Sequence, residues 1–204
     1  MTADLKASLE QFAHDWEVEI LKAPPLIAPV RQFTYPQQIV GEEDALGRGA
    51  VRLMVRPAAG GDFLATCALG FKDPSMPTGA FPCPDSREMC AVAGGYAYVI
   101  NTLEPTLCTL LALKPVVEIR PLVAQGLLLF VGFHSVAAWG RNGLAWESAR
   151  LSWEGVRITG VEGGTLQGLG WNLLTDREAA FSIDLLTGQH QGGGFAQPPQ
   201  RQRS

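Results

Sequence analysis

Large apolar side chains recur along the chain with two different spacings, and each spacing predicts a different element. Between residues 3 and 22 they are three or four positions apart: Leu5, Leu9, Phe12, Trp16 and Ile20. This is the stripe of a 3.6-residue period, which predicts an N-terminal amphipathic helix over residues 1–23 that ends before Pro24-Pro25. We expect this helix to pack on a sheet; the alternative is a detachable helix that docks on a partner.

Farther along the chain the apolar positions alternate with polar ones, which is typical of strands that bury one face. Two such runs flank a turn at residues 58–61 and predict a hairpin: Val51, Leu53 and Val55, then Phe63, Ala65, Cys67, Leu69 and Phe71. Residues 91–102 are also strand-like, with Tyr96 and Tyr98 on one face. Leu127 to Phe133 is apolar on both faces and predicts a central strand covered on both sides.

Glycine-punctuated hairpins are expected in the last third of the chain. With Glu154-Gly155 as a two-residue turn, four apolar side chains share one face of a hairpin over residues 148–159: Leu151, Trp153, Val156 and Ile158. Gly163-Gly164 predicts a second turn, and the Asp184 carboxylate is placed to cap a third at Thr187-Gly188. The whole pattern predicts a mainly β fold, an antiparallel meander arranged like a sandwich or a propeller, in a single domain over residues 37–195.

Proline-rich segments interrupt this pattern in two places. Residues 24–36 contain four prolines and predict an extended connector. Residues 72–90 contain four more, at positions 74, 77, 82 and 84, which exclude a helix or a central strand there. An ordered loop of this length is either functional or a rigid arm that covers the end of a sheet. The polar tail over residues 196–204 is expected to be disordered.

Two segments resemble one blade of a quinoprotein-type β-propeller, in which a strand, a turn and a glycine-tryptophan unit recur. The first, over residues 128–146, ends in V-A-A-W-G-R-N-G-L-A-W, and the second, over residues 181–188, ends in D-L-L-T-G. Regular propellers repeat with a period of about 40–45 residues, whereas the spacing here is irregular. The resemblance implies an antiparallel meander of blade-like units and gives no expectation of a bound cofactor.

Composition and charge argue against two classes of protein, those that bind nucleic acids and those that span a membrane. The chain has 204 residues, 47% of them hydrophobic, with a formal net charge of −4 and four cysteines. Its arginines are scattered among acids, so we expect no nucleic-acid partner. The apolar stretch over residues 115–139 is broken by Glu118 and Arg120, so we expect no membrane-spanning helix. An N-terminus without an apolar signal segment, together with few cysteines, predicts a cytoplasmic protein with reduced thiols.

No catalytic, metal or cofactor motif is recognisable in the sequence. Cys83 and Cys90 are accompanied by neither C-x2-C nor a paired histidine, so no metal site is expected. His134 and Ser135 are neighbours on a predicted strand and point to opposite faces, which excludes a nucleophile–base pair between them. The glycines at 160–170 match no phosphate-binding loop. We therefore predict no catalytic residues, no metal and no cofactor.

The remaining signal is a set of large side chains near polar turns. Residues of these types supply much of the contact energy of protein interfaces, and five of them are candidates for binding: Phe81, Arg87, Trp139, Arg141 and Trp146. They lie in the proline loop and around the turn after Trp139. We predict a non-catalytic cytoplasmic protein that binds another macromolecule, with a protein as the expected partner, in a toxin-neutralising or accessory role. A small-molecule or carbohydrate-binding module and an enzyme with an unrecognised site are the alternatives.

Overall fold

The chain folds into four four-stranded sheets that follow one another in sequence. The computed structural model describes residues 11–27, 29–36 and 46–195. The first sheet contains β1 (Trp16–Leu21), β2 (Arg31–Tyr35), β3 (Ala50–Pro57) and β4 (Phe63–Ala68). The second contains β5 (Gly79–Pro82), β6 (Glu88–Ala93), β7 (Tyr96–Asn101) and β8 (Cys108–Leu110).

The third sheet contains β9 (Val116–Leu122), β10 (Leu127–Gly132), β11 (Val136–Gly140) and β12 (Gly143–Glu147), with the short 3-10 helix η1 (Val123–Gln125) between its first two strands. The fourth contains β13 (Val156–Glu162), β14 (Thr165–Asn172), β15 (Arg177–Asp184) and β16 (His190–Gly192). In these last three sheets each strand pairs antiparallel with the next one in the chain. The first sheet has the order β1-β3-β4-β2, and β2 pairs with β4 in parallel.

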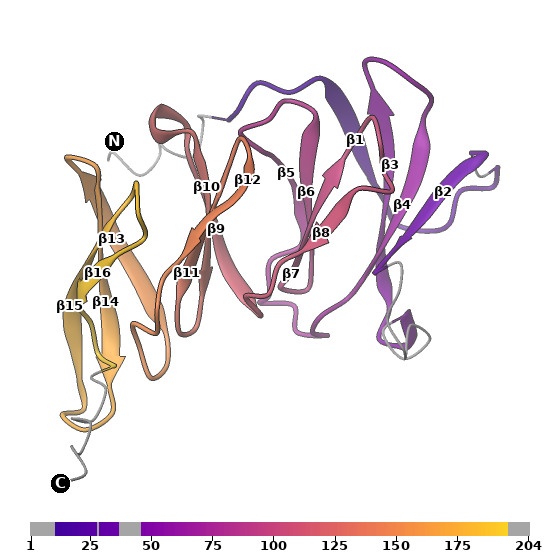
Figure 1. Cartoon of the computed structure of the whole chain (residues 1–204). Helices are drawn as coiled ribbons and strands as arrows, with labels where there is room; N and C mark the ends of the chain where they lie inside the picture. The colour runs from indigo at the N-terminus through magenta and orange to yellow at the C-terminus, as the bar shows by residue number, and fades with distance from the viewer. Residues whose placement is uncertain (1–10, 28, 37–45, 196–204) are drawn as a thin grey trace, which may run out of the picture.

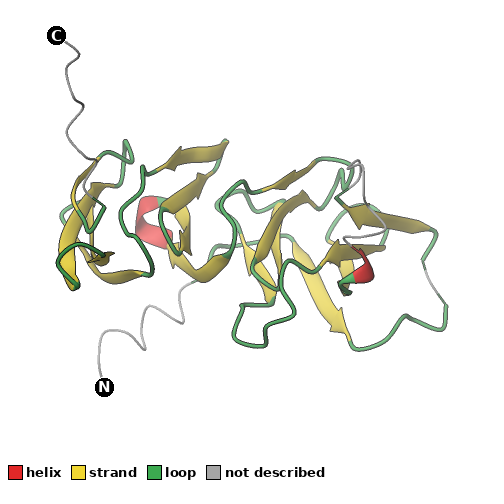
Figure 2. Cartoon of the chain, turned by 90° about the horizontal axis from the view of Figure 1, so that it is seen from below, coloured by secondary structure: helices red, strands yellow, loops and turns green. Residues whose placement is uncertain are grey.

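The four sheets stand side by side in an open row, with the first and the fourth at its two ends (Figures 1 and 2). Four sheets of four strands are compatible with the blades of a propeller-type fold. The predicted mainly β architecture is therefore confirmed, with antiparallel meanders in the last three sheets, and the hairpin predicted around residues 58–61 is present as β3 and β4. Below, the upper end of the row is the end that carries the β5–β6 and β11–β12 turns, and the lower end carries the β6–β7 turn (Figure 1).

Each pair of neighbouring sheets encloses its own hydrophobic core. Strand β10 contributes side chains to two of these cores. Leu128 and Phe130 lie in the core between the second and third sheets, and Leu129 and Val131 lie in the core between the third and fourth. Successive side chains of a strand point to opposite faces, so a strand covered on both sides needs an unbroken apolar run. The central strand predicted from residue 127 onward is confirmed.

The outward faces of the two terminal sheets carry polar and charged side chains. On the fourth sheet the residues that alternate with the core positions are Arg157, Thr159, Gln167, Ser182 and Gln191. On the first sheet they include Glu17, Glu19, Arg52 and Arg56. Ion pairs join charges across each face, with 2.7 Å between Arg157 and Glu178 and 3.2 Å between Arg56 and Glu19. Water can solvate these side chains at both ends of the row.

The predicted N-terminal helix is wrong for the part of it that the structure describes. Residues 16–21 form β1, which pairs with β3. Trp16 and Ile20 are four residues apart, and an even spacing also keeps side chains on one face of a strand. These two residues therefore fit both periods, and pairing with β3 selects the strand. Phe12 precedes β1 and packs in the core between the second and third sheets. The expected start of the helix, residues 1–10, lies outside the described residues. The described residues contain no helix that is long and apolar enough to cross a bilayer.

Both proline-rich segments contain strands that lie at a sheet edge. The expected connector over residues 24–36 includes β2, and the expected loop over residues 72–90 includes β5 and the start of β6. Strands β2 and β5 are the edges of their sheets, where the missing proline N–H is tolerated. The segment without strands between the first two sheets is thus shorter than predicted, at residues 69–78. The tail over residues 196–204, expected to be disordered, lies outside the described residues.

Two of the three turns predicted in the last third are confirmed, and the hairpin over residues 148–159 is wrong. Gly163-Gly164 connects β13 to β14, and the Asp184 carboxylate accepts a 2.8 Å hydrogen bond from the Thr187 backbone N–H. By contrast, β13 pairs with β14 and not with the preceding segment. Trp153 is half-buried and lies outside the core that its three predicted partners share.

Candidate functional site

Three of the five candidate residues lie at the upper end of the second and third sheets. Trp139, near the end of β11, donates a 2.7 Å hydrogen bond from its indole Nε1 to Oε2 of Glu88, at the start of β6. The backbone carbonyl of Glu88 accepts a 3.3 Å bond from the indole of Trp16 on β1. Burial raises the pKa of the Glu88 carboxyl, and the hydrogen bond from Trp139 opposes that rise. Glu88 thus ties three sheets together.

Arg87 and Arg141 both act on one carboxylate beside this contact. Arg87 holds Asp85 through two side-chain bonds, from Nη2 to Oδ2 at 2.7 Å and from Nε to Oδ1 at 3.1 Å. This bidentate pair lowers the pKa of Asp85 to about 2, and the positive charge of Arg141 adds to the effect. Next to it the Ser86 hydroxyl donates a hydrogen bond to the Asp15 carboxylate. These groups satisfy one another, which is the chemistry of a structural contact between sheets.

The two candidate tryptophans lie on opposite faces of the third sheet. Trp139 is 5% exposed in the core shared with the second sheet, and Trp146 is 7% exposed in the core shared with the fourth. In a regular two-residue hairpin Trp146 would pair with Ala137 and share the face of Trp139. A register shift makes it pair with Ala138 instead, because Ala145 is an extra, bulged residue. Both candidate tryptophans are therefore buried, and they face different cores.

Trp146 and Phe81 take part in packing away from the Glu88 contact. The Trp146 indole donates a 2.8 Å hydrogen bond to the backbone carbonyl of Leu185. Its ring lies over Gly188, where a Cβ atom would come within 2.7 Å of it. Phe81 is half-buried on β5 and packs against the core between the second and third sheets. The structure therefore brings Arg87, Trp139 and Arg141 to the upper end, packs Phe81 against the same core as Trp139, and leaves Trp146 in the core on the other face of the third sheet.

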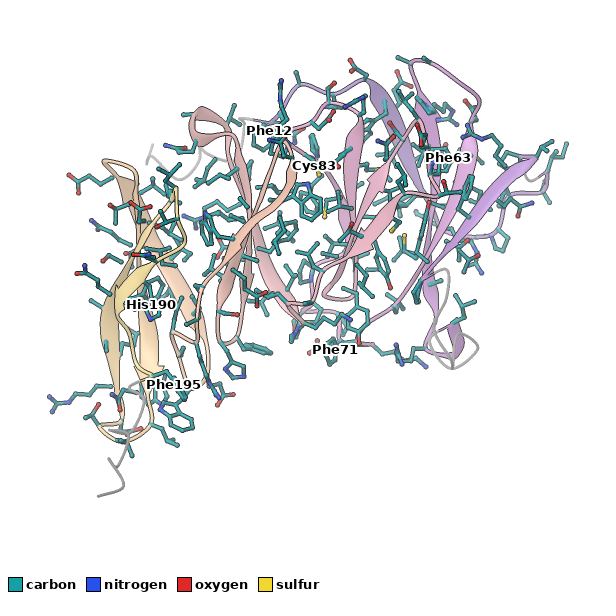
Figure 3. The ribbon with its side chains drawn as sticks, viewed as in Figure 1. Phe12, Phe63, Phe71, Cys83, His190 and Phe195 are labelled. Carbon is teal, nitrogen blue, oxygen red and sulfur yellow. The ribbon has the colours of Figure 1, made fainter. Side chains whose placement is uncertain are left out.

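A second candidate site lies at the lower end, beside the junction of the first and second sheets. An open groove of about 630 Å³ runs along the proline loop and is lined by Leu69, Phe71, Lys72, Asp73, Pro74, Ser75, Met76, Pro77, Thr78 and Gly94. Phe71 is 42% exposed and lies at this lower end in Figure 3. Seven of the ten lining residues, 72–78, fall in the loop that the sequence had singled out.

Two cationic side chains contact the Tyr96 ring beside this groove. The Phe71 ring meets the Tyr96 ring edge-on, with centroids 6.0 Å apart. The Lys114 ammonium lies 4.8 Å from the centre of the Tyr96 ring, and the Arg48 guanidinium carbon lies 6.0 Å from it, both at cation–π distance. Arg48 also donates a 3.0 Å hydrogen bond from Nε to the Leu69 carbonyl, which holds its guanidinium at the groove. Arg48 and Lys114 are 66 positions apart, so sequence spacing gave no sign that they meet.

The acidic residue that lines the groove is engaged within its own loop. Asp73 Oδ1 accepts hydrogen bonds of 2.8 Å from the backbone N–H and from the hydroxyl of Ser75. These bonds lower the pKa of Asp73, so it is ionised but internally satisfied. Lys72 and Lys114, by contrast, are exposed, and Arg48 is half-buried beside them. The described surface here is locally positive, although the whole chain carries a net charge of −4.

The possible metal ligands among the described residues do not form a cluster. Over residues 11–27, 29–36 and 46–195, no three of the His, Cys, Asp and Glu side chains are close enough to hold a metal ion. All four cysteines are free thiols. Burial raises the pKa of Cys67, Cys83 and Cys90 and raises that of Cys108 to about 12. Such thiols stay protonated near neutral pH, where only the thiolate is a nucleophile.

Comparison with known proteins gives little similarity. No protein-family model matches the chain, and no curated protein matches it. Among solved structures, the crystal structure of the N-terminal domain of Nup159 aligns with 93% of this chain at 12% identity and a TM-score of 0.36. The alignment covers 53% of that domain, so this chain spans about half of the domain's length. A likeness at this level supports no conclusion about the function of this chain.

Proposed function

We propose that this chain is a non-catalytic protein-binding module that engages its partner with the lower end of the row of sheets. The observation that supports the proposal is the groove beside the proline loop, which combines exposed Phe71 and half-buried Met76 with Arg48 at its edge. Aromatic residues, methionine and arginine are the residue types enriched at the centre of protein interfaces. The proposal includes the cytoplasmic location and the accessory or toxin-neutralising role expected from the sequence.

The loop that forms the groove is held in place before any partner binds. The Gly94 backbone N–H donates a 3.0 Å hydrogen bond to the Thr78 hydroxyl, and the Gly95 N–H donates a 3.2 Å bond to the Pro77 carbonyl. The β6–β7 turn comes so close to the loop that position 94 requires glycine, because a Cβ on Gly94 would lie 2.4 Å from the Phe71 carbonyl oxygen. A surface that is already ordered loses less conformational entropy on binding. This favours a binding role for residues 69–78.

The upper end is a weaker candidate for the contact surface. Its two tryptophans are buried, and the exposed Arg87 already holds Asp85 through a bidentate pair. A partner would have to displace that pair before Arg87 could bind it, and a bidentate, charge-assisted contact is among the stronger hydrogen-bonded interactions. Of the candidates chosen from the sequence, Arg87 and Arg141 are the exposed ones, so they remain the upper-end residues to test.

Site-specific photo-crosslinking in the source organism tests the proposal. A photoreactive amino acid replaces Lys72, at the groove, in one protein, and Gln191, on the polar outer face of the fourth sheet, in a matched control. We expect a discrete protein adduct from position 72 and none from position 191. A third protein with the probe at Arg141 examines the upper end. Adducts from position 141 alone would place the contact there and contradict the proposal, as would the absence of protein adducts from every position.

A further inference from the structure

We propose that the groove beside the proline loop binds an acidic, extended peptide segment of the partner protein. In this complex the aspartate or glutamate side chains of the peptide face Lys72 and Lys114, and one apolar side chain of the peptide packs on Phe71 and Met76. The inference rests on the proposed function, since it assigns a ligand chemistry to the same surface.

Charge complementarity is the first argument. Three cationic side chains converge on this surface: Lys72 lines the groove, while Lys114 and Arg48 lie on the Tyr96 ring beside it. The carboxylate of Asp73 accepts two hydrogen bonds from Ser75 within the loop. None of the three cations forms a salt bridge among the described residues. A carboxylate-bearing segment would pair with these cations and would be steered toward this surface.

The apolar lining is the second argument, because it separates a peptide from a simple anion. Leu69, Phe71, Met76 and two prolines contribute to the groove. Phe71 exposes 42% of its surface although it contacts Tyr96. Exposed apolar surface next to polar groups marks binding sites more often than isolated apolar residues do. An inorganic anion or a sugar phosphate would leave this apolar surface in water, whereas a peptide side chain would cover it.

The overall charge argues against a nucleic acid as the occupant. A polyanionic backbone gains affinity by contacting many cations along an extended track, and the chain as a whole carries a net charge of −4. Here the cations lie around a single aromatic ring and one loop. A short run of carboxylates matches a patch of this size. Nucleic acid remains an outcome that the experiment below can detect.

Fluorescence anisotropy with three short labelled peptides tests the inference. The first has a central leucine-tryptophan pair flanked by aspartate and glutamate. The second has the corresponding amides in place of every acid, and the third has serines in place of the apolar pair. We expect the first to bind at least tenfold more tightly than either of the others. Its affinity should fall as the ionic strength rises above about 0.15 M, where the Debye length is about 8 Å.

Matched charge variants locate the site. Lys72→Gln and Lys114→Gln should each weaken the acidic peptide about threefold, the range of one exposed charge pair, and the double variant about tenfold. Arg177→Gln removes an equal charge from an exposed residue at the start of β15, in the fourth sheet, and should leave the affinity unchanged. Phe71→Ser should weaken the acidic peptide and abolish the advantage of the apolar pair. Circular dichroism and thermal unfolding confirm that each variant is folded.

The possible failures can be told apart. Three results would each overturn the ligand assignment. The first is equal binding of the acidic and amide peptides, and the second is equal effects of Lys72→Gln and Arg177→Gln. The third is tighter binding of a labelled single-stranded oligonucleotide than of the acidic peptide. If photo-crosslinks from position 72 still capture a protein in that case, the binding function stands and only the acidic character of the ligand is wrong. If no crosslink forms either, both proposals fail.

Discussion

The indole of Trp139 donates a 2.7 Å hydrogen bond to the Glu88 carboxylate across the junction of the second and third sheets. The two residues are 51 positions apart in the chain. Glu88 is half-buried, and a carboxylate taken partly out of water needs a donor to remain ionised at low cost. This bond gives the upper end of the junction a specific polar contact in addition to its apolar core.

Replacing Trp139 with phenylalanine should make the stability of the fold more dependent on whether Glu88 is ionised. The pKa of Glu88, already raised by burial, should rise further, because the variant lacks the donor that stabilises the ionised form. We expect a loss of about 1–3 kcal/mol in the free energy of unfolding at pH 7. The loss should be smaller below the ordinary glutamate value of 4.5, where the carboxyl is neutral. Denaturant unfolding at both pH values provides the measurement.

Trp146→Phe is the control for that experiment. Its indole donates to the uncharged carbonyl of Leu185, so the destabilisation it causes should not depend on the protonation of a carboxylate. A loss that changes equally with pH in the two variants would show that the Trp139–Glu88 bond has no special electrostatic role.

The Asp85–Arg87 pair should stabilise the fold in a defined pH window. The pKa of Asp85 is lowered from 3.8 to about 2, first by the hydrogen bonds from the Arg87 side chain. A lowered folded-state pKa means that the stabilisation is complete above about pH 4 and is lost as the pH falls toward 2. Arg87→Gln should return the Asp85 pKa most of the way to 3.8. Arg141→Gln, which removes only a nearby charge, should move it less, and carboxyl NMR titration would reveal the reverse order if this assignment is wrong.

The glycine at position 188 should be required by the tryptophan above it. Its φ of +73° disfavours any side chain, and a Cβ there would lie 2.7 Å from Trp146. Gly155 has a nearly equal φ of +77° but no atom within 4 Å of its hypothetical Cβ. We expect Gly155→Ala to cost about 1–2 kcal/mol from backbone strain, and Gly188→Ala to cost about 1–3 kcal/mol more from overpacking. Equal melting temperatures of the two variants would contradict the contact.

Leu129 should be among the most sensitive core positions, because it is 0% exposed in the core between the third and fourth sheets. Leu129→Ala should lower the free energy of unfolding by about 2–5 kcal/mol through lost burial and a cavity. The same change at Leu144, which is 54% exposed on the neighbouring edge strand β12, should cost less than about 0.5 kcal/mol. Chemical denaturation of both variants compares them, and similar midpoints would contradict the burial of Leu129 in this core.

Local patterns in the sequence determined the elements whose signals have a single reading. The run from Leu127 is apolar at both parities, and only a strand covered on both faces uses such a pattern well. Asp184 precedes Thr187 by three residues, and a carboxylate at that spacing closes the turn by bonding nearby backbone N–H groups. These features depend on residues close in sequence, so they could be predicted without knowledge of the fold.

Tertiary structure decided the features whose local signals were ambiguous. Trp16 and Ile20 suit a helix and a strand equally, and pairing with β3 selected the strand. One extra residue, Ala145, turned Trp146 to the face opposite Trp139, because the side-chain period of a strand is two and a single insertion reverses it. No local pattern in the sequence signals such a bulge.

At the candidate site, too, the sequence predicted some features, and the tertiary structure determined the others. The proline content of residues 72–78 marked the loop, since prolines exclude a helix and a central strand wherever they occur. The cations beside that loop could not be found from spacing, because Arg48 precedes the first long hairpin and Lys114 follows the second sheet. They meet on Tyr96 only because the first two sheets pack face to face and bring the β6–β7 turn against the loop. The sequence thus determined which segments would be stiff or buried, and packing between the sheets determined which charges would converge.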